Sequence, residues 1–168
     1  IWQKARTGSS SHFHYWFDSV RGGRYGLQSN TTGAEFDTSN ANNIVFKESG
    51  FDMAASTGGQ GNAASASYVA WCWKAGGAAV SNSDGTITSS VSANTEAGFS
   101  IVSFTGNATS GATVGHGLNK KPKWIILKER GNANNWTVYH ESLGYTGGGD
   151  TYVLFLDINN DYGGGFAG

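Results

Sequence analysis

The stretch Phe13-His14-Tyr15-Trp16-Phe17 alternates in the way that a β-strand requires. In an extended chain, successive side chains point to opposite faces. Phe13, Tyr15 and Phe17 therefore share one face, and His14 and Trp16 share the other. This pattern predicts a strand with an aromatic core face and a second face that carries an indole and an imidazole.

A second aromatic run, Tyr68–Lys74, follows the same rule. Val69, Trp71 and Trp73 fall on one face, and the small side chains of Ala70 and Cys72 fall on the other. The run predicts a central strand that is covered on both faces. It also predicts that Cys72 is a buried free thiol, because a single cysteine forms no internal disulfide.

Similar short segments recur about every dozen residues along the chain, each flanked by Gly, Asn, Ser or Asp. The other segments are Ile1–Ala5, Arg24–Leu27, Ile44–Phe46, Thr86–Val91, Phe99–Thr105, Trp124–Lys128, Trp136–Tyr139 and Tyr152–Leu156. Only Tyr139–Leu143 is compatible with one or two helical turns. This spacing predicts an all-β fold, a β-sandwich or jelly-roll-like module of antiparallel sheets.

The composition narrows the functional classes. Charged residues make up 14% of the chain, aromatic residues 13%, and the formal net charge is −1. Such a chain lacks the basic excess that attracts nucleic acid or an anionic membrane. No apolar run is long enough to span a bilayer, and no secretory signal is visible. The ends, Ile1 and a glycine-rich tail, indicate a piece of a longer gene product.

Two regions of the sequence also resemble each other. Ile1–Arg6 parallels Ile125–Arg130, about 124 residues later. In the same order, Tyr15 matches Tyr139, and Tyr25-Gly26-Leu27 matches Tyr152-Val153-Leu154. We therefore expect a duplication. Residues 1–81 form the first β-module, and residues 119–168 begin a second, related one.

Between these modules, residues 82–118 are expected to form an exposed hairpin and a connecting strand. Asn82–Asn94 is unusually polar, and Asp84-Gly85 is a good hairpin turn. The hairpin is either an arm that pairs with a neighbouring subunit or an ordinary surface hairpin.

This middle region carries a family resemblance. The matching segments are Asn82–Asn94, Glu96–Val102, Gly106-Asn107, Ala112–Leu118, Pro122 and Trp124–Arg130, preceded by Leu27, Ser29–Thr32, Gly50-Phe51, Tyr68–Trp71 and Lys74. The pattern resembles a repeat domain of unknown function that is common in virion proteins of marine tailed phages, including those of cyanobacteria. The resemblance covers nearly the whole chain.

The resemblance implies a structural protein on the surface of a phage particle, a tail fibre or tail-associated appendage, rather than an enzyme. Its expected partners are other virion proteins and copies of itself, with host-surface glycan as a further partner. Nucleic acid and membrane insertion are not expected. The alternatives are a capsid decoration or head-fibre protein, and a tailspike domain that binds or cleaves glycan.

The resemblance supplies no catalytic residues, so the remaining predictions rest on the chemistry of single motifs. His116 lies between two glycines in the loop before Pro122. Its imidazole is expected to cap backbone groups of this loop, and Pro122 to start the next strand. A Gly-x-Ser-x-Gly elbow and a phosphate-binding loop are both missing from the sequence.

Two ligand sites remain as weaker predictions. Asp157, Asn159 and Asp161 place oxygen ligands at alternate positions, as calcium loops do. No cofactor other than this calcium ion is expected. Trp16 and Trp136 are the tryptophans that we expect to stack on sugar rings, although most aromatic side chains in such a domain form the core.

Overall fold

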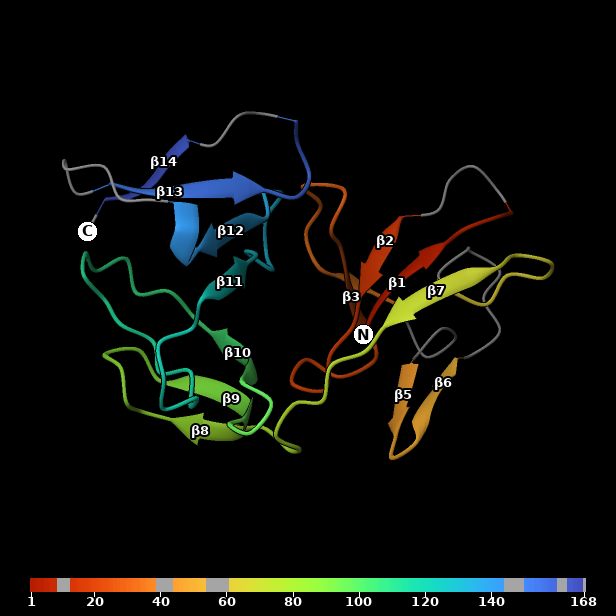
Figure 1. Ribbon diagram of the computed structural model, residues 1–168, viewed down its shortest axis with the longest axis horizontal. Coiled ribbons are helices and arrows are strands. Elements are labelled where there is room, and N and C mark those ends of the chain that lie inside the picture. The colour runs from red at the N-terminus through yellow and green to blue at the C-terminus, as the bar shows by residue number, and fades with distance from the viewer. Residues whose placement is uncertain (9–12, 39–43, 54–60, 144–149, 160–162, 168) are drawn as a thin grey trace. The chain divides into compact units, whose positions relative to one another are not determined.

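A computed structural model describes residues 1–8, 13–38, 44–53, 61–143, 150–159 and 163–167. The all-β prediction is confirmed, because these residues form strands in several antiparallel sheets, consistent with a sandwich-like fold (Figure 1). The helical structure of the described residues is a single 3-10 turn, η2, at Glu141–Leu143. Within the same residues, no helix has the length and apolarity to cross a membrane.

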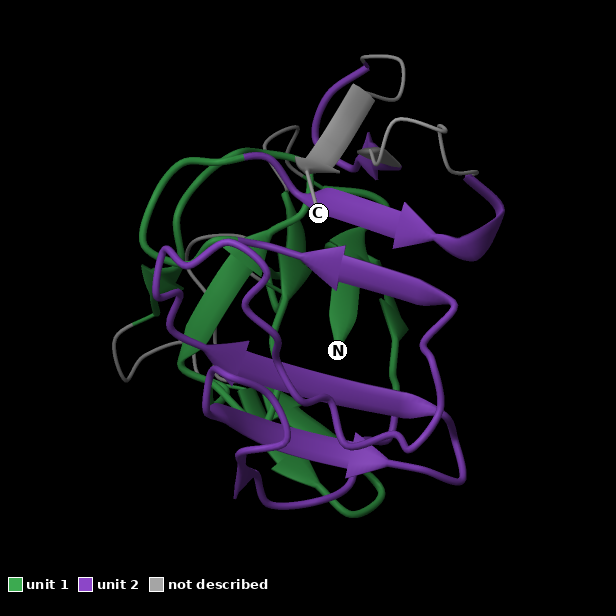
Figure 2. Ribbon diagram, turned by 90° about the vertical axis from the view of Figure 1, so that its left-hand side faces the viewer, with its two compact units in different colours: residues 1–73, 129–134 green, residues 74–128, 135–168 purple. Residues whose placement is uncertain are grey.

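The chain divides into two compact units (Figure 2). Unit 1 contains Ile1–Trp73 together with Glu129–Asn134, and unit 2 contains Lys74–Lys128 together with Asn135–Gly168. The expected boundaries after residues 81 and 118 do not coincide with this division. Residues 82–118 are part of unit 2, and a short segment of the expected second module belongs to unit 1.

Unit 1 is built on one five-stranded sheet with the order β4-β3-β2-β1-β7 and a separate β5-β6 hairpin. The strands are β1 Trp2–Ala5, β2 His14–Trp16, β3 Tyr25–Gln28, β4 Phe36–Asp37, β5 Ile44–Lys47, β6 Gly50–Met53 and β7 Tyr68–Trp71. Tyr15, Phe17 and Ile44 form the core, and partly buried apolar side chains from β4, β5 and β6 pack against it. Tyr15 and Phe17 therefore form the predicted aromatic core face, whereas Phe13, which was expected on the same face, is 37% exposed.

The prediction for Tyr68–Lys74 is wrong in one respect. β7 lies at the edge of the sheet, because it pairs with β1 alone. Its Ala70 is exposed, and so is Cys72, which follows the strand. The run of apolar and small residues that resembled a buried strand instead places one row of large side chains on a single face of an edge strand.

Unit 2 contains a three-stranded sheet, β10-β9-β8, and a four-stranded sheet, β11-β12-β13-β14. The strands are β8 Val80–Asn82, β9 Ser89–Asn94, β10 Phe99–Phe104, β11 Trp124–Leu127, β12 Thr137–His140, β13 Asp150–Phe155 and β14 Gly163–Ala167. β8 and β9 form the predicted hairpin. It is not an exposed arm, because β9 is the central strand and buries Ser89, Val91 and Ser92.

The two regions predicted to be related both form a three-stranded antiparallel meander, β1-β2-β3 in unit 1 and β11-β12-β13 in unit 2. The registers correspond. Trp2 stands opposite Trp16, which stands opposite Leu27; likewise Ile126 stands opposite Val138, which stands opposite Leu154.

The meanders also share a backbone clamp. Ser29 donates its N–H to the carbonyl of His14, while the N–H of His14 binds the Asn30 side chain. In the second meander, Leu156 donates to the carbonyl of Trp136, and the N–H of Trp136 binds the Asp157 side chain.

Candidate binding surface

One face of the unit 1 sheet carries a row of tryptophans. The pairing register places Trp71 of β7, Trp2 of β1 and Trp16 of β2 directly opposite one another. The ring centroids of Trp2 lie 5.1 Å from those of Trp71 and 5.3 Å from those of Trp16. Trp73, just beyond β7, stacks on Trp16 at 5.8 Å with an interplanar angle of 16°. We call these four residues the tryptophan face.

Two of the four residues of the tryptophan face are exposed to solvent. Trp71 is 45% exposed and Trp73 is 39% exposed, whereas Trp2 and Trp16 are half-buried. Large aromatic side chains cost free energy when they remain in water, and clustered exposed ones mark contact sites on proteins. Tryptophan is also enriched among the residues that dominate binding energy at interfaces.

Polar groups border these rings. The register places Lys4 opposite His14 on the same face as Trp2 and Trp16. Burial, and next the positive charge of Lys4, lower the pKa of His14, so its imidazole is neutral near pH 7. A neutral imidazole offers one donor and one acceptor, and Lys4 offers a cation. Hydroxyl and carboxylate groups of a ligand would find partners beside the aromatic rings.

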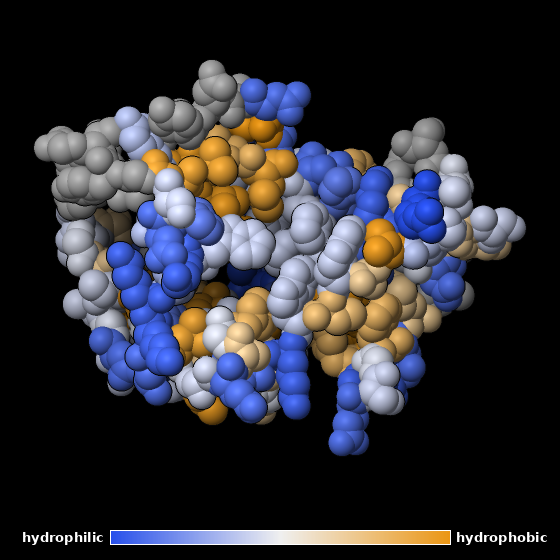
Figure 3. All heavy atoms as spheres, viewed as in Figure 1, coloured by the Kyte–Doolittle hydropathy of each residue, from blue (hydrophilic) through white to orange (hydrophobic). Residues whose placement is uncertain are grey.

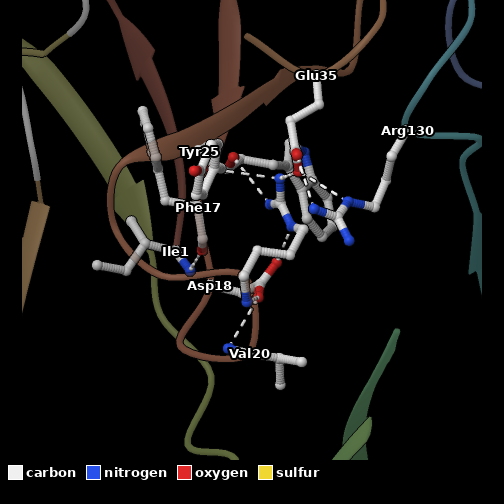
Figure 4. A network of polar contacts seen from close by, with 9 residues as sticks. Ile1, Phe17, Asp18, Val20, Tyr25, Glu35 and Arg130 are labelled. Carbon is white, nitrogen blue, oxygen red and sulfur yellow. Dashed lines mark hydrogen bonds and ion pairs between the residues drawn. The ribbon is translucent and has the colours of Figure 1, made fainter. Parts of the chain in front are cut away.

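A partly buried ion network lies in another part of unit 1 (Figure 4). Arg21, whose side chain is 7% exposed, binds Asp18 through Nε at 2.5 Å and Glu35 through Nη1 at 2.9 Å. Arg130 joins from the 129–134 segment and contacts both oxygens of Glu35, at 2.9 Å and 2.7 Å. The backbone N–H of Glu35 also donates to the carbonyl of Arg130. No pattern in the sequence marked this network.

The network brings two carboxylates to one guanidinium, which raises the question of glycoside cleavage. Burial alone would raise the pKa of Glu35, but the hydrogen bonds from Arg130 and Arg21 outweigh it, and the pKa is lowered. A general acid in glycoside hydrolysis needs a raised pKa. Glu35 has the opposite shift, and its oxygens are held by arginines, so this pair is suited to stabilising the fold.

His116 and Pro122 both lie in the segment that precedes β11. The Nδ1 of His116 accepts a hydrogen bond from the N–H of Leu118 at 3.1 Å, so the imidazole caps its own loop. Gly117 between them has a φ of 69°, a left-handed conformation that glycine adopts without strain. Pro122 is half-buried and precedes the first residue of β11 by two positions.

The calcium prediction stays a prediction, whereas the prediction that Trp136 stacks on a sugar is wrong. Oδ1 of Asp157 accepts the backbone N–H of Trp136 at 2.9 Å, which gives this carboxylate a structural role. Asn159 is exposed, and Asp161 lies outside the described residues. Among the residues that the structure describes, no group of three or more His, Cys, Asp or Glu side chains could hold a metal ion. Trp136 is only 3% exposed, so its ring belongs to the core of unit 2 and is not available to a sugar.

Unit 2 presents apolar side chains of its own. Trp124 is 52% exposed, Ile125 44% and Leu127 38%, all on β11. Leu154 and Leu156 are also exposed, and Figure 3 shows apolar side chains gathered over the β13 region.

Comparison with known proteins places the chain in a family. No curated protein and no solved structure matches it. A family model described as a domain of unknown function, DUF7483, matches residues 1–164. Because this match covers nearly the whole sequence, the chain belongs to the DUF7483 family.

Proposed function

We propose that this chain is a structural protein on the surface of a tailed bacteriophage particle, a tail fibre or tail-associated appendage that acts by adhesion and assembly. The tryptophan face is the observation that carries the proposal, because exposed clustered indoles supply contact energy without any catalytic machinery. The sequence resemblance to marine phage virion proteins supports the particle surface as its location.

The location is tested on purified particles. Antibodies against the chain, or a cryo-EM map of the intact particle, would report where the chain lies. Density on the tail or its fibres is the expected result. Density tiled over the capsid would replace the proposal by the alternative of a capsid decoration or head-fibre protein. Absence from the purified particle would refute the virion role.

Host-surface glycan is the second candidate partner. The arrangement that favours it is the half-exposed Trp71 ring at the sheet edge, with Lys4 and His14 on the same face. Sugar rings stack their apolar faces on aromatic rings, and their hydroxyls bind neighbouring donors and acceptors. An acidic polysaccharide would also gain from the Lys4 cation.

A glycan array, followed by titration calorimetry, tests this candidate. Trp71→Ala is expected to weaken binding at least tenfold, since truncation of a central aromatic contact costs about 2 kcal/mol or more. Trp124→Ala is the matched control, because Trp124 is similarly exposed but lies on unit 2. Equal binding by both variants and the unaltered chain would rule out the tryptophan face as the glycan site. Shortening of a bound oligosaccharide would favour the tailspike alternative.

A further inference from the structure

β11 has one edge that faces away from β12, which we call its outer edge. β11 is the terminal strand of its sheet, and it pairs with β12 alone among the described strands. Unpaired edges of apolar strands are templates for pairing with another strand. On β11, three of the four side chains are exposed, at 38% or more.

In unit 1, the strand that corresponds to β11 is β1, and β7 covers its outer edge. The matching registers equate Ile126 of β11 with Trp2 of β1, and Leu127 with Gln3. In unit 1, β7 runs antiparallel along the outer edge of β1 and places Trp71 opposite Trp2. Gln3 is 2% exposed, whereas Leu127 is 38% exposed. Among the described strands of the four-stranded sheet, none takes the place that β7 has in unit 1.

The backbone of β11 is oriented to accept such a strand. Glu141 donates its N–H to the carbonyl of Lys123, so Lys123 and Glu141 form a hydrogen-bonded pair across β11 and β12. Hydrogen-bonded pairs alternate along an antiparallel ladder, so Ile125 bonds toward β12 while Trp124 and Ile126 direct their N–H and C=O outward. The same alternation holds in unit 1. There, Ile1 and Phe17 form a hydrogen-bonded pair, which turns the N–H and C=O of Trp2 toward β7.

We propose that the outer edge of β11 binds an antiparallel strand of the β7 type, with aromatic side chains at the positions of Trp71 and Trp73 on one face and small side chains at those of Ala70 and Cys72 on the other. In the register of unit 1, a residue equivalent to Trp71 stands opposite Ile126, and one equivalent to Trp73 stands opposite Trp124. Such aromatic and aliphatic cross-strand pairs stabilise sheets. The inference deepens the proposed assembly role, for which it supplies the chemistry of the partner strand.

A synthetic peptide of residues 67–74, capped at both ends, fluorescently labelled and carrying Cys72→Ser, serves as the probe. Fluorescence anisotropy is expected to show saturable binding of one peptide per chain. Ile126→Pro removes an N–H that makes no bond to β12, so the sheet should persist while peptide binding weakens about tenfold or more. Ile126→Ala keeps the N–H and is expected to weaken binding less. Circular dichroism melting of both variants checks that they remain folded.

Two N-methylated peptides provide the sharper control. Methylation at the Trp71 position blocks the N–H that points toward β11, whereas methylation at the Ala70 position blocks one that points away. The first peptide is expected to lose binding and the second to keep it. Equal binding of both would overturn the proposal, as would undiminished binding to Ile126→Pro, which would indicate exchange with β7. These measurements use no particle, so their failure leaves the virion proposal standing, and capsid density in the particle map leaves β11 pairing intact.

Discussion

The partly buried ion network makes a quantitative prediction for Glu35→Gln. The glutamine has the same shape, but it removes the charge that two arginines share, at distances of 2.7–2.9 Å. A hydrogen bond to a charged group contributes about 1.5–3 kcal/mol, and removing one partner of a fully buried ion pair costs about 3–5 kcal/mol. Here the Arg130 side chain is 44% exposed, Arg21 keeps Asp18 and glutamine retains one acceptor, so we expect the free energy of unfolding to fall by only about 2 kcal/mol.

Urea titration at pH 7 measures this loss. Asp37→Asn is the matched control, because Asp37 forms a bidentate ion pair with Arg24, but both side chains are more than 40% exposed. Exposed ion pairs contribute about 0–1 kcal/mol, so the control should remain close to the unaltered chain. An equal effect of the two substitutions would contradict the partly buried network as a source of stability.

The contribution of the Glu35 carboxylate to the stability of the fold depends on pH. The folded-state pKa of Glu35 lies below its ordinary value of 4.5. The ionised carboxylate therefore stabilises the fold fully above pH 4.5, and this contribution is lost as pH falls through the lower folded-state pKa. The difference in stability between the unaltered chain and Glu35→Gln should shrink below pH 4.5. A difference that stays constant from pH 7 to pH 3 would refute the reasoning.

Three further predictions concern single sites. Gly23→Ala should lower the free energy of unfolding by about 1–3 kcal/mol, because a Cβ at Gly23 would approach a backbone carbonyl oxygen of β5 to 1.7 Å. Gly50→Ala is the control in the same urea titration, because the space around Gly50 is open. Cys72 should react with a thiol reagent in the folded chain at the rate of a free exposed thiol, and a reaction that awaits denaturant would contradict its exposure. Asp157→Ala should cost about 1–2 kcal/mol through loss of the bond to Trp136, whereas Asp157→Asn should cost less, and equal losses in thermal melts would argue against the clamp.

The sequence predicted which side chains share a face of a strand better than it predicted which strands lie side by side. Alternation placed Trp16 opposite the core face of its strand, and it placed Trp71 and Trp73 on one face of theirs. The tryptophan face itself depends on Trp2 pairing with both Trp16 and Trp71, a register that only folding determines. The Glu35–Arg130 contact joins residues 95 positions apart, and neither belongs to a recognisable motif.

Burial was harder to predict than strand identity, for a physical reason. Local pattern shows which residues share a face, but the place of a strand within its sheet depends on how many partners it finds. Cys72 follows an edge strand and is exposed, although its apolar surroundings in sequence are typical of a buried strand. The polarity of the run that includes Ser89 and Ser92 predicts a surface hairpin. It is the centre of a small sheet, where small side chains pack closely.

The comparison of the two meanders shows what internal similarity can and cannot place. Alignment of the sequence equated β1 with β11 and β3 with β13 in the register that the structure has. It equated Tyr15 with Tyr139, whereas the ladders make Thr137 the counterpart of Tyr15. Because side chains alternate with a period of two, a shift of two residues preserves the face and only displaces the pair along the strand. A matching ladder is therefore stronger evidence than a matching tyrosine. The ladder makes the β1–β7 pair the template for the edge of β11 that no described strand covers.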